Sequence, residues 1–185
     1  MKTMNTMNIR TSLVIGAVVV ICIVGIALAT PIVGLKVGTI LSSGTINTEI
    51  SQHVRVALPA TSGEEQEGKD KDEDNQWTAK LVTNGPSNFS VQDVVFAPYG
   101  HTGWHSHPGI LLSSVISGSI EWYDANCQRT VYNVGDSLTE STATHYVRNV
   151  GSVDAHFMVT YVLANGQPRR IDQPAPPCAA AYGLD

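Results

Sequence analysis

An all-β domain, a barrel or sandwich of short strands, is the fold class that this sequence of 185 residues predicts. Beyond residue 30 the chain holds 16 valines against nine leucines, and valine favours strands over helices. Strand-like runs recur between turn residues at the short spacing that is typical of barrels and sandwiches. No window past residue 34 shows a convincing helical period over three turns.

The predicted strands follow one another along the chain after residue 34. They lie at 35–42, 52–58, 77–83, 89–97, 110–117, 119–124, 129–133, 137–140, 145–150 and 155–163. The segment 166–185 after the last strand is rich in proline, glycine and alanine. We therefore expect it to form a C-terminal tail that runs along the surface.

A hydrophobic segment precedes the β region. Residues 13–29 are all apolar or glycine, and Lys2 and Arg10 precede them as a positive flank. Small residues at 27–29 stand at the spacing that signal peptidase requires. We therefore predict that residues 1–30 form an N-terminal hydrophobic helix that serves either as a cleaved signal peptide or as an uncleaved membrane anchor.

Both interpretations of this segment place the rest of the chain outside the cytoplasm. An uncleaved span of residues 13–33 would be long enough to cross a bilayer, and its positive flank would stay inside. Residues 30–185 are thus expected to be secreted, periplasmic or on the cell surface. Membrane contact is expected only through the N-terminal segment, if it is not cleaved.

The charge of the chain is concentrated in one segment. The net charge is −5, and the run 64–74 (EEQEGKDKDED), with seven acids and two lysines, carries all of this excess. We expect residues 62–76 to form an acidic, solvated surface loop. Because the remaining charges balance, no basic patch is left to neutralise phosphates, and a nucleic-acid partner is not expected.

Histidines at two places suggest a metal site. His105 and His107 are two residues apart, so on a strand both imidazoles face the same side. His145 and Asn149 share a face of a later predicted strand in the same way. Neutral imidazole is a good ligand for zinc, copper, nickel and iron.

Together these two segments resemble the motifs of the cupin superfamily, in its small single-domain bacterial form. The first motif runs from the segment before His105 and His107 to Gly118, and the second runs from Gly135 to His145 and Asn149. This resemblance covers roughly residues 35–165. It implies that residues 31–165 form a cupin double-stranded β-helix, a jelly-roll-like barrel. It also implies that His105, His107 and His145 bind one divalent transition metal.

The sequence departs from the cupin pattern at the fourth ligand. Counting back from Gly118 places Leu111 where the family has a metal-ligating glutamate. The proline–glycine turn of the second motif is also absent, and 140–142 (EST) stand in its place. His101, on a nearby loop, and Glu121, on the next strand, are possible additional ligands.

The missing carboxylate affects the expected chemistry. Three neutral imidazoles would leave the full charge of a divalent cation uncompensated, so the site should attract an anionic small molecule. The metal could be iron, manganese, zinc, copper or nickel. The protein is then either a small-molecule oxygenase, lyase or isomerase, or a non-catalytic metal-binding, ligand-binding or scaffold module at the cell envelope. The catalytic residues stay unknown, the site could also be vestigial, and a homodimer is possible.

Two cysteines lie in the predicted exported part. Cys127 follows a predicted strand at a hairpin, and Cys178 lies in the C-terminal tail, whereas Cys22 lies in the hydrophobic segment. Two cysteines in an oxidising compartment are more often bridged than free. We therefore predict a Cys127–Cys178 disulfide that anchors the tail, with two unpaired thiols as the alternative.

Overall fold

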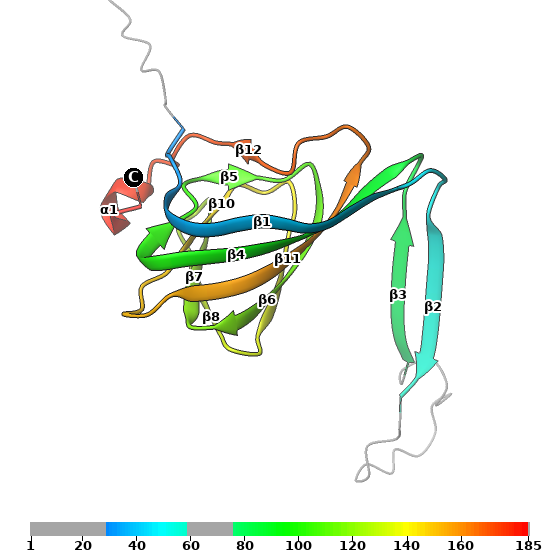
Figure 1. Cartoon of the computed structure of the whole chain (residues 1–185), viewed down its shortest axis with the longest axis horizontal. Helices are drawn as coiled ribbons and strands as arrows, with labels where there is room; N and C mark the ends of the chain where they lie inside the picture. The colour runs from blue at the N-terminus through cyan, green and yellow to red at the C-terminus, as the bar shows by residue number, and fades with distance from the viewer. Residues whose placement is uncertain (1–28, 59–75, 185) are drawn as a thin grey trace, which may run out of the picture.

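The computed structural model describes residues 29–58 and 76–184, whose regular secondary structure is almost entirely strand (Figure 1). The elements are β1 (Val33–Ile46), β2 (Ser51–Ala57), β3 (Gln76–Val82), β4 (Ser87–His101), β5 (His105–Ser106), β6 (Gly109–Ser117), β7 (Ser119–Asp124), β8 (Arg129–Asn133), β9 (Ser137–Glu140), β10 (His145–Arg148), β11 (Ala155–Ala164), β12 (Ile171–Asp172) and α1 (Ala179–Tyr182). The expectation of an all-β fold is confirmed. The predicted N-terminal helix lies outside the described residues.

Ten of the strands form one sheet that curls into a nearly closed barrel (Figure 1). Its main path runs in the order β12-β5-β10-β4-β11-β6-β9, with β1 paired to β4 and β7 paired to both β10 and β8. Every pairing in it is antiparallel. Apart from β7 and β8, paired strands in this sheet are not consecutive in the sequence, and β5 lies between β10 and the C-terminal β12.

Strict alternation along β11 shows how the core is built. Phe157, Val159, Tyr161 and Leu163 are buried, and the residues between them are partly exposed. A period of two places successive side chains on opposite faces of the sheet, so one face of β11 fills the barrel. The same interior receives Leu111 from β6 and other apolar side chains of the core.

The glycine of the first motif makes a tight turn between two barrel strands. Gly118 separates β6 from β7 and has a φ of 72°, a region that side chains rarely adopt. A Cβ atom at this position would lie 2.7 Å from the carbonyl oxygen of Asp154. A glycine is therefore needed here both for the backbone angle and for the close approach of another strand.

The C-terminal segment, expected as a surface tail, adds a short strand to the edge of the barrel sheet and buries two of its side chains. Ile171 and Asp172 form β12, which pairs with β5. Beyond it, Ala179 and Leu184 are fully buried. A strand of two residues shows no alternation, so neither β12 nor β5 could be recognised from its pattern.

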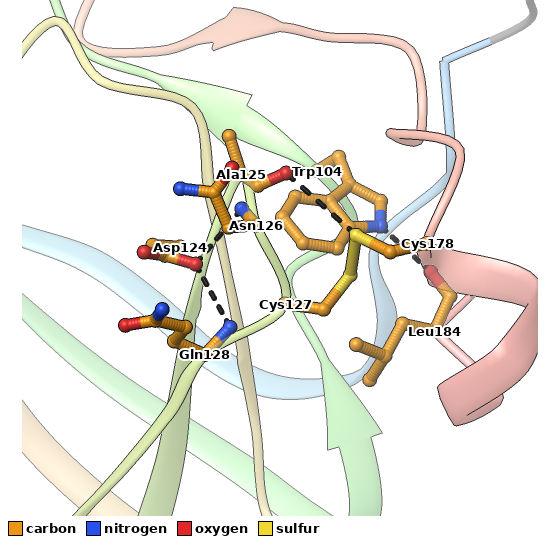
Figure 2. Close-up of a disulfide and its surroundings, with 8 residues drawn as sticks. All are labelled: Trp104, Asp124, Ala125, Asn126, Cys127, Gln128, Cys178 and Leu184. Carbon is orange, nitrogen blue, oxygen red and sulfur yellow. Dashed lines mark hydrogen bonds between the residues drawn. A yellow bond between two sulfur atoms is a disulfide. The ribbon is translucent and has the colours of Figure 1, made fainter.

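The Cys127–Cys178 disulfide is present and ties this segment to the hairpin between β7 and β8 (Figure 2). The two Cα atoms lie 6.2 Å apart, within the distance that a disulfide spans. Figure 2 shows the Trp104 indole beside the bridge, with its Nε1–H donating to the carbonyl oxygen of Leu184 at 2.8 Å. Trp104, which directly precedes a predicted metal ligand, is fully buried in this small second core.

β2 and β3 form a separate hairpin that extends away from the barrel (Figure 1). The predicted acidic loop between them lies outside the described residues, except for Gln76, with which β3 begins. Within residues 29–58 and 76–184, no helix is long and apolar enough to span a membrane.

Candidate metal centre

The structure brings His105, His107 and His145 together inside the barrel. All three are buried, and each offers a ring nitrogen within 4.8 Å of the nitrogens of the other two. The ring centroids of His105 and His145 are 4.3 Å apart. Those of His107 lie 4.8 Å from His105 and 5.1 Å from His145. Such a group can hold a metal ion.

Backbone pairing between distant segments produces this cluster. His105 on β5 lies directly opposite His145 on β10 in an antiparallel pair. The backbone N–H of His107 donates to the carbonyl oxygen of Ser141 at 3.0 Å, which draws the loop before β10 against the end of β5. The spacing of the first two histidines then places the second imidazole beside the other two.

Each of the three imidazoles is held in one tautomer by a backbone carbonyl. The Nδ1 atom of His105 lies 3.0 Å from the oxygen of Gly103, and that of His145 lies 2.9 Å from the oxygen of Ala143. The Nδ1 atom of His107 contacts the oxygen of Arg169. Since a carbonyl oxygen only accepts, each Nδ1 carries the proton, and in the neutral ring each Nε2 is left with a lone pair.

A carboxylate that the motif analysis did not select completes the cluster. Glu140, at the end of β9, has its two oxygens 3.2 Å from Nε2 of His145 and 3.5 Å from Nε2 of His107. The Nε1–H of Trp122 donates to one of these oxygens at 3.1 Å. The Trp122 ring also stacks on His145, so a single side chain orients both groups.

Glu140 can supply the carboxylate that the first motif lacks. It pairs across the sheet with Leu111, the residue that stands at the family's glutamate position. The carboxylate thus enters the site from the strand next to the one that the motif predicts. The motif position itself carries Leu111, as the sequence showed, and the acid beside the histidines is Glu140.

The spacing and the hydrogen bonding of these groups fit a metal ion. Two ligands about 2.1 Å from a tetrahedral zinc ion lie about 3.4 Å apart, which is close to the distances from Glu140 to the two imidazoles, whereas the three histidine nitrogens lie within the wider limit of 4.8 Å from one another. The Nε2 atoms of His107 and His145 are buried and have no hydrogen-bond partner among the described residues. In the neutral rings their lone pairs face the negative oxygens of Glu140, and the two repel each other. A cation placed among these atoms would attract both.

The surroundings of Glu140 and His105 favour the protonation states that bind metals. Burial alone would raise the pKa of Glu140, but in the metal-free protein a proton on Nε2 of His107 or His145 would hydrogen-bond the carboxylate and hold its pKa well below its usual value. Burial, followed by the charges of His145 and Arg170, holds the pKa of His105 well below 6.5. A deprotonated carboxylate and a neutral imidazole are the forms that bind metals.

His101, one of the two possible additional ligands, lies outside this cluster. Its Nδ1 accepts a hydrogen bond from the backbone N–H of Gly103 at 3.2 Å, and its ring stacks on Tyr146. Burial and the nearby Arg148 lower its pKa. The contacts of His101 therefore hold it against Gly103 and Tyr146, outside the three-histidine cluster.

Glu121, the other possible ligand, is buried within a different ionic network. Its carboxylate accepts hydrogen bonds from Arg129 at 2.6 Å, from Arg148 at 2.9 Å and from Tyr123 at 2.5 Å. The structure therefore does not bring Glu121 to the histidines, because two arginines already neutralise it.

A cavity of about 310 Å³ adjoins Glu140 inside the barrel. Its walls include the core residues Leu111 and Phe157 and the hydroxyl-bearing Tyr161, which donates to Gln92 at 2.7 Å. Burial, together with the charge of Glu140, raises the pKa of Tyr161 to about 12. Tyr161 therefore stays protonated near neutral pH and can act there as a hydrogen-bond donor.

Comparisons with known proteins agree with this architecture. The family model described as the cupin domain matches residues 92–161, which include all three histidines and Glu140. No curated protein matches the chain significantly.

Several solved structures are similar to parts of the chain. A cupin domain from Bordetella pertussis is 23% identical over 41% of this chain and 82% of that one, with a TM-score of 0.37. A protein with a double-stranded β-helix domain from Klebsiella pneumoniae is 23% identical over 46% of this chain and 75% of that one, with a TM-score of 0.41. Together with the barrel that carries the histidine motifs, the family match identifies residues 92–161 of this chain as a cupin domain.

Proposed function

We propose that this protein is an exported cupin that binds one divalent transition metal through His105, His107, His145 and Glu140. The observation that carries the proposal is the fixed tautomer of the three imidazoles, which turns every Nε2 lone pair away from the supporting carbonyls. Two of these nitrogens are buried without a hydrogen-bond partner among the described residues. Three nitrogen ligands and one oxygen ligand suit zinc, copper, nickel, iron or manganese.

Each side chain of this site has a different role in metal binding. The histidines supply neutral nitrogen ligands, and Glu140 supplies one negative charge. Trp122 holds the carboxylate and the His145 ring in place. A bound metal would supply Lewis-acid or redox chemistry, and the cavity next to Glu140 gives a small molecule room to reach it.

Metal content tests this proposal directly. We expect about one transition metal per chain in protein purified from its native compartment. His145→Ala should lose most of this metal, and Glu140→Gln should weaken zinc affinity at least about tenfold. His53→Ala is the matched control, because His53 lies on the exposed hairpin. If His145→Ala keeps the metal stoichiometry of the wild type, the site is wrongly assigned.

A second candidate function is catalysis as an oxygenase, a lyase or an isomerase on a small molecule. The cavity beside Glu140 favours it, because a purely structural metal would need no adjoining space. Oxygenase chemistry requires a redox-active metal, so iron, copper or manganese in the native protein supports that reaction class. Zinc as the native metal contradicts the oxygenase and leaves the lyase, the isomerase or a non-catalytic envelope module.

Export is supported by the disulfide, since such bridges persist in oxidising compartments. N-terminal sequencing of protein collected outside the cytoplasm tests it. A chain that begins at Thr30 supports a cleaved signal peptide, whereas a full-length chain in the membrane fraction supports an anchor. Free Cys127 and Cys178 thiols in a cytoplasmic protein would contradict export.

A further inference from the structure

The cavity beside the metal centre has apolar walls and a polar end. Eight of its residues are apolar and come from the N-terminal segment and five barrel strands: Ile32, Leu35, Val94, Phe96, Leu111, Val147, Phe157 and Val159. Six polar residues complete it: Gln92, Thr102, Glu140, Tyr161, Arg169 and Arg170. Its volume of about 310 Å³ lies at the lower end of the range for small-molecule sites, so a ligand of about one ring fits it.

The polar end of this cavity carries more positive charge than negative charge. Arg169 and Arg170 line it together, and Glu140 is the one acidic residue among the described lining residues. A metal ion held by Glu140 and the histidines would add two further positive charges. With or without the metal, the balance of charge in the cavity favours an anion.

Arg170 has a hydrogen-bonding group that is not used. Its Nε–H donates to Asp172 at 2.5 Å on the exposed side. Its Nη2 is buried and has no hydrogen-bond partner among the described residues. A buried cationic donor without a partner costs free energy, and a small rotation of the guanidinium toward the cavity would let a ligand carboxylate accept this hydrogen bond and remove that cost.

The backbone places both arginines next to the metal ligands. The carbonyl oxygen of Arg169 accepts the Nδ1–H of His107. Two residues further on, Ile171 and Asp172 pair with β5, the strand of His105. The segment that supplies the cations therefore orients the His107 imidazole and pairs with the strand of His105, which holds both arginines beside the metal ligands.

We propose that this cavity binds a small organic carboxylate with an apolar body, and that Arg170 is the residue that recognises the carboxylate. The apolar walls pack against the body of the ligand, and the guanidinium of Arg170 hydrogen-bonds its charged end. The proposal rests on the proposed function, because it names the class of small molecule that the same site takes. A larger or more polar anion, such as a sugar phosphate, would leave polar groups against the apolar walls.

Calorimetric titration with three probes tests the class of ligand. Benzoate has both an apolar ring and a carboxylate, benzyl alcohol has the ring without the charge, and acetate has the charge without the ring. We expect benzoate to bind at least tenfold more tightly than either of the other two. Equal affinity for acetate or for benzyl alcohol would overturn the proposed class, as would tighter binding of inorganic phosphate.

Substitutions test the role of Arg170. Arg170→Gln should weaken benzoate binding at least tenfold and leave benzyl alcohol binding unchanged. Arg170→Lys keeps the charge and should restore part of the affinity, which a merely structural role would not predict. Arg55→Gln, on the exposed hairpin, is the matched control. Circular dichroism shows whether the variants fold. If Arg170→Gln does not fold, the benzoate affinity of Arg170→Lys is compared with that of the wild type instead. Unchanged benzoate affinity in either folded variant refutes the proposal.

Metal content, measured on the same samples, separates this proposal from the proposed function. If benzoate binds through Arg170 but the wild type holds no metal, the metal site fails and the carboxylate site stands. If one metal binds per chain but Arg170→Gln binds benzoate like the wild type, the carboxylate site fails and the metal site stands.

Discussion

Removing the Cys127–Cys178 disulfide should destabilise the protein and loosen the segment that supports the metal centre. The bridge joins residues 51 positions apart. In the chain-entropy model a loop of this length corresponds to about 4 kcal/mol at 25 °C, which is an upper estimate because the unfolded chain keeps some structure. Typical domains have a free energy of unfolding of about 5–15 kcal/mol, so the loss is a large part of the total.

The structure also indicates where the damage should occur. Trp104 is fully buried against Leu184, and Ala179 is buried in the same small cluster. Without the bridge, this C-terminal packing is held by the Trp104–Leu184 hydrogen bond, by the pairing of β12 with β5 and by the hydrogen bonds of Gln173 to Trp104 and Ser106. We therefore expect the C-terminal segment to open locally before the barrel unfolds.

The double variant Cys127→Ala/Cys178→Ala tests this reasoning in urea denaturation. We expect its free energy of unfolding to fall by about 2–4 kcal/mol relative to the oxidised wild type. Hydrogen exchange should increase first in residues 173–184. Alanine at position 127 meets the same left-handed backbone as the cysteine, whose φ is 60°, so the backbone adds little to the difference. The reduced wild type is the matched control and should behave like the variant.

The result that would refute this reasoning is a double variant within about 0.5 kcal/mol of the oxidised wild type. Unchanged hydrogen exchange in residues 173–184 would refute the local part of the prediction, because the segment would then be held by its other contacts. Zinc affinity gives a third measurement. It should weaken in the double variant, because the carbonyl that orients His107 belongs to Arg169 in the segment that the bridge anchors.

Two further predictions concern buried carboxylates, one introduced and one removed. Leu111→Glu would place a second carboxylate opposite Glu140 in the core, so we expect the free energy of unfolding, measured by thermal denaturation, to fall by about 3 kcal/mol. A gain in zinc affinity without such a loss of stability would contradict this prediction. Burial alone would raise the pKa of Glu121, but hydrogen bonds from Tyr123 and Arg148 hold it below its ordinary 4.5. Because the folded pKa is the lower one, its stabilising effect is present above pH 4.5 and is lost as the pH falls through the folded pKa. Glu121→Gln should therefore show a shallower loss of stability in acid than the wild type, and equal slopes in urea titrations between pH 5 and pH 3 would contradict the assignment.

Much of the barrel could be predicted from the sequence, because the signals are local. The alternation along residues 155–163 marks a half-buried strand wherever that strand pairs, and β11 (Ala155–Ala164) matches it closely. The spacing of His105 and His107 places both imidazoles on one side by backbone geometry alone. Only two cysteines follow the hydrophobic segment, so a single pairing is available to them, and the structure confirms this disulfide.

The identity of the fourth group of the metal centre could be found only from the tertiary structure. Glu140 was visible in the sequence only as part of a departure from the motif's turn, and Glu121 and His101 were considered as ligands instead. Which acid reaches the histidines depends on the register between β6 and β9, which places Glu140 opposite Leu111. Strand register is set by pairing and by burial over long distances, and no local pattern encodes it.

The same limit applies to the C-terminal segment. Its proline-rich composition predicts a surface tail, and by itself the sequence determines little more about residues 166–184. Only the folded barrel offers the free edge of β5, with which Ile171 and Asp172 pair. That pairing brings Arg169 to His107 and Arg170 to the cavity. Short segments such as this one adopt their structure because a partner strand satisfies their backbone hydrogen bonds, and that partner exists only in the tertiary fold.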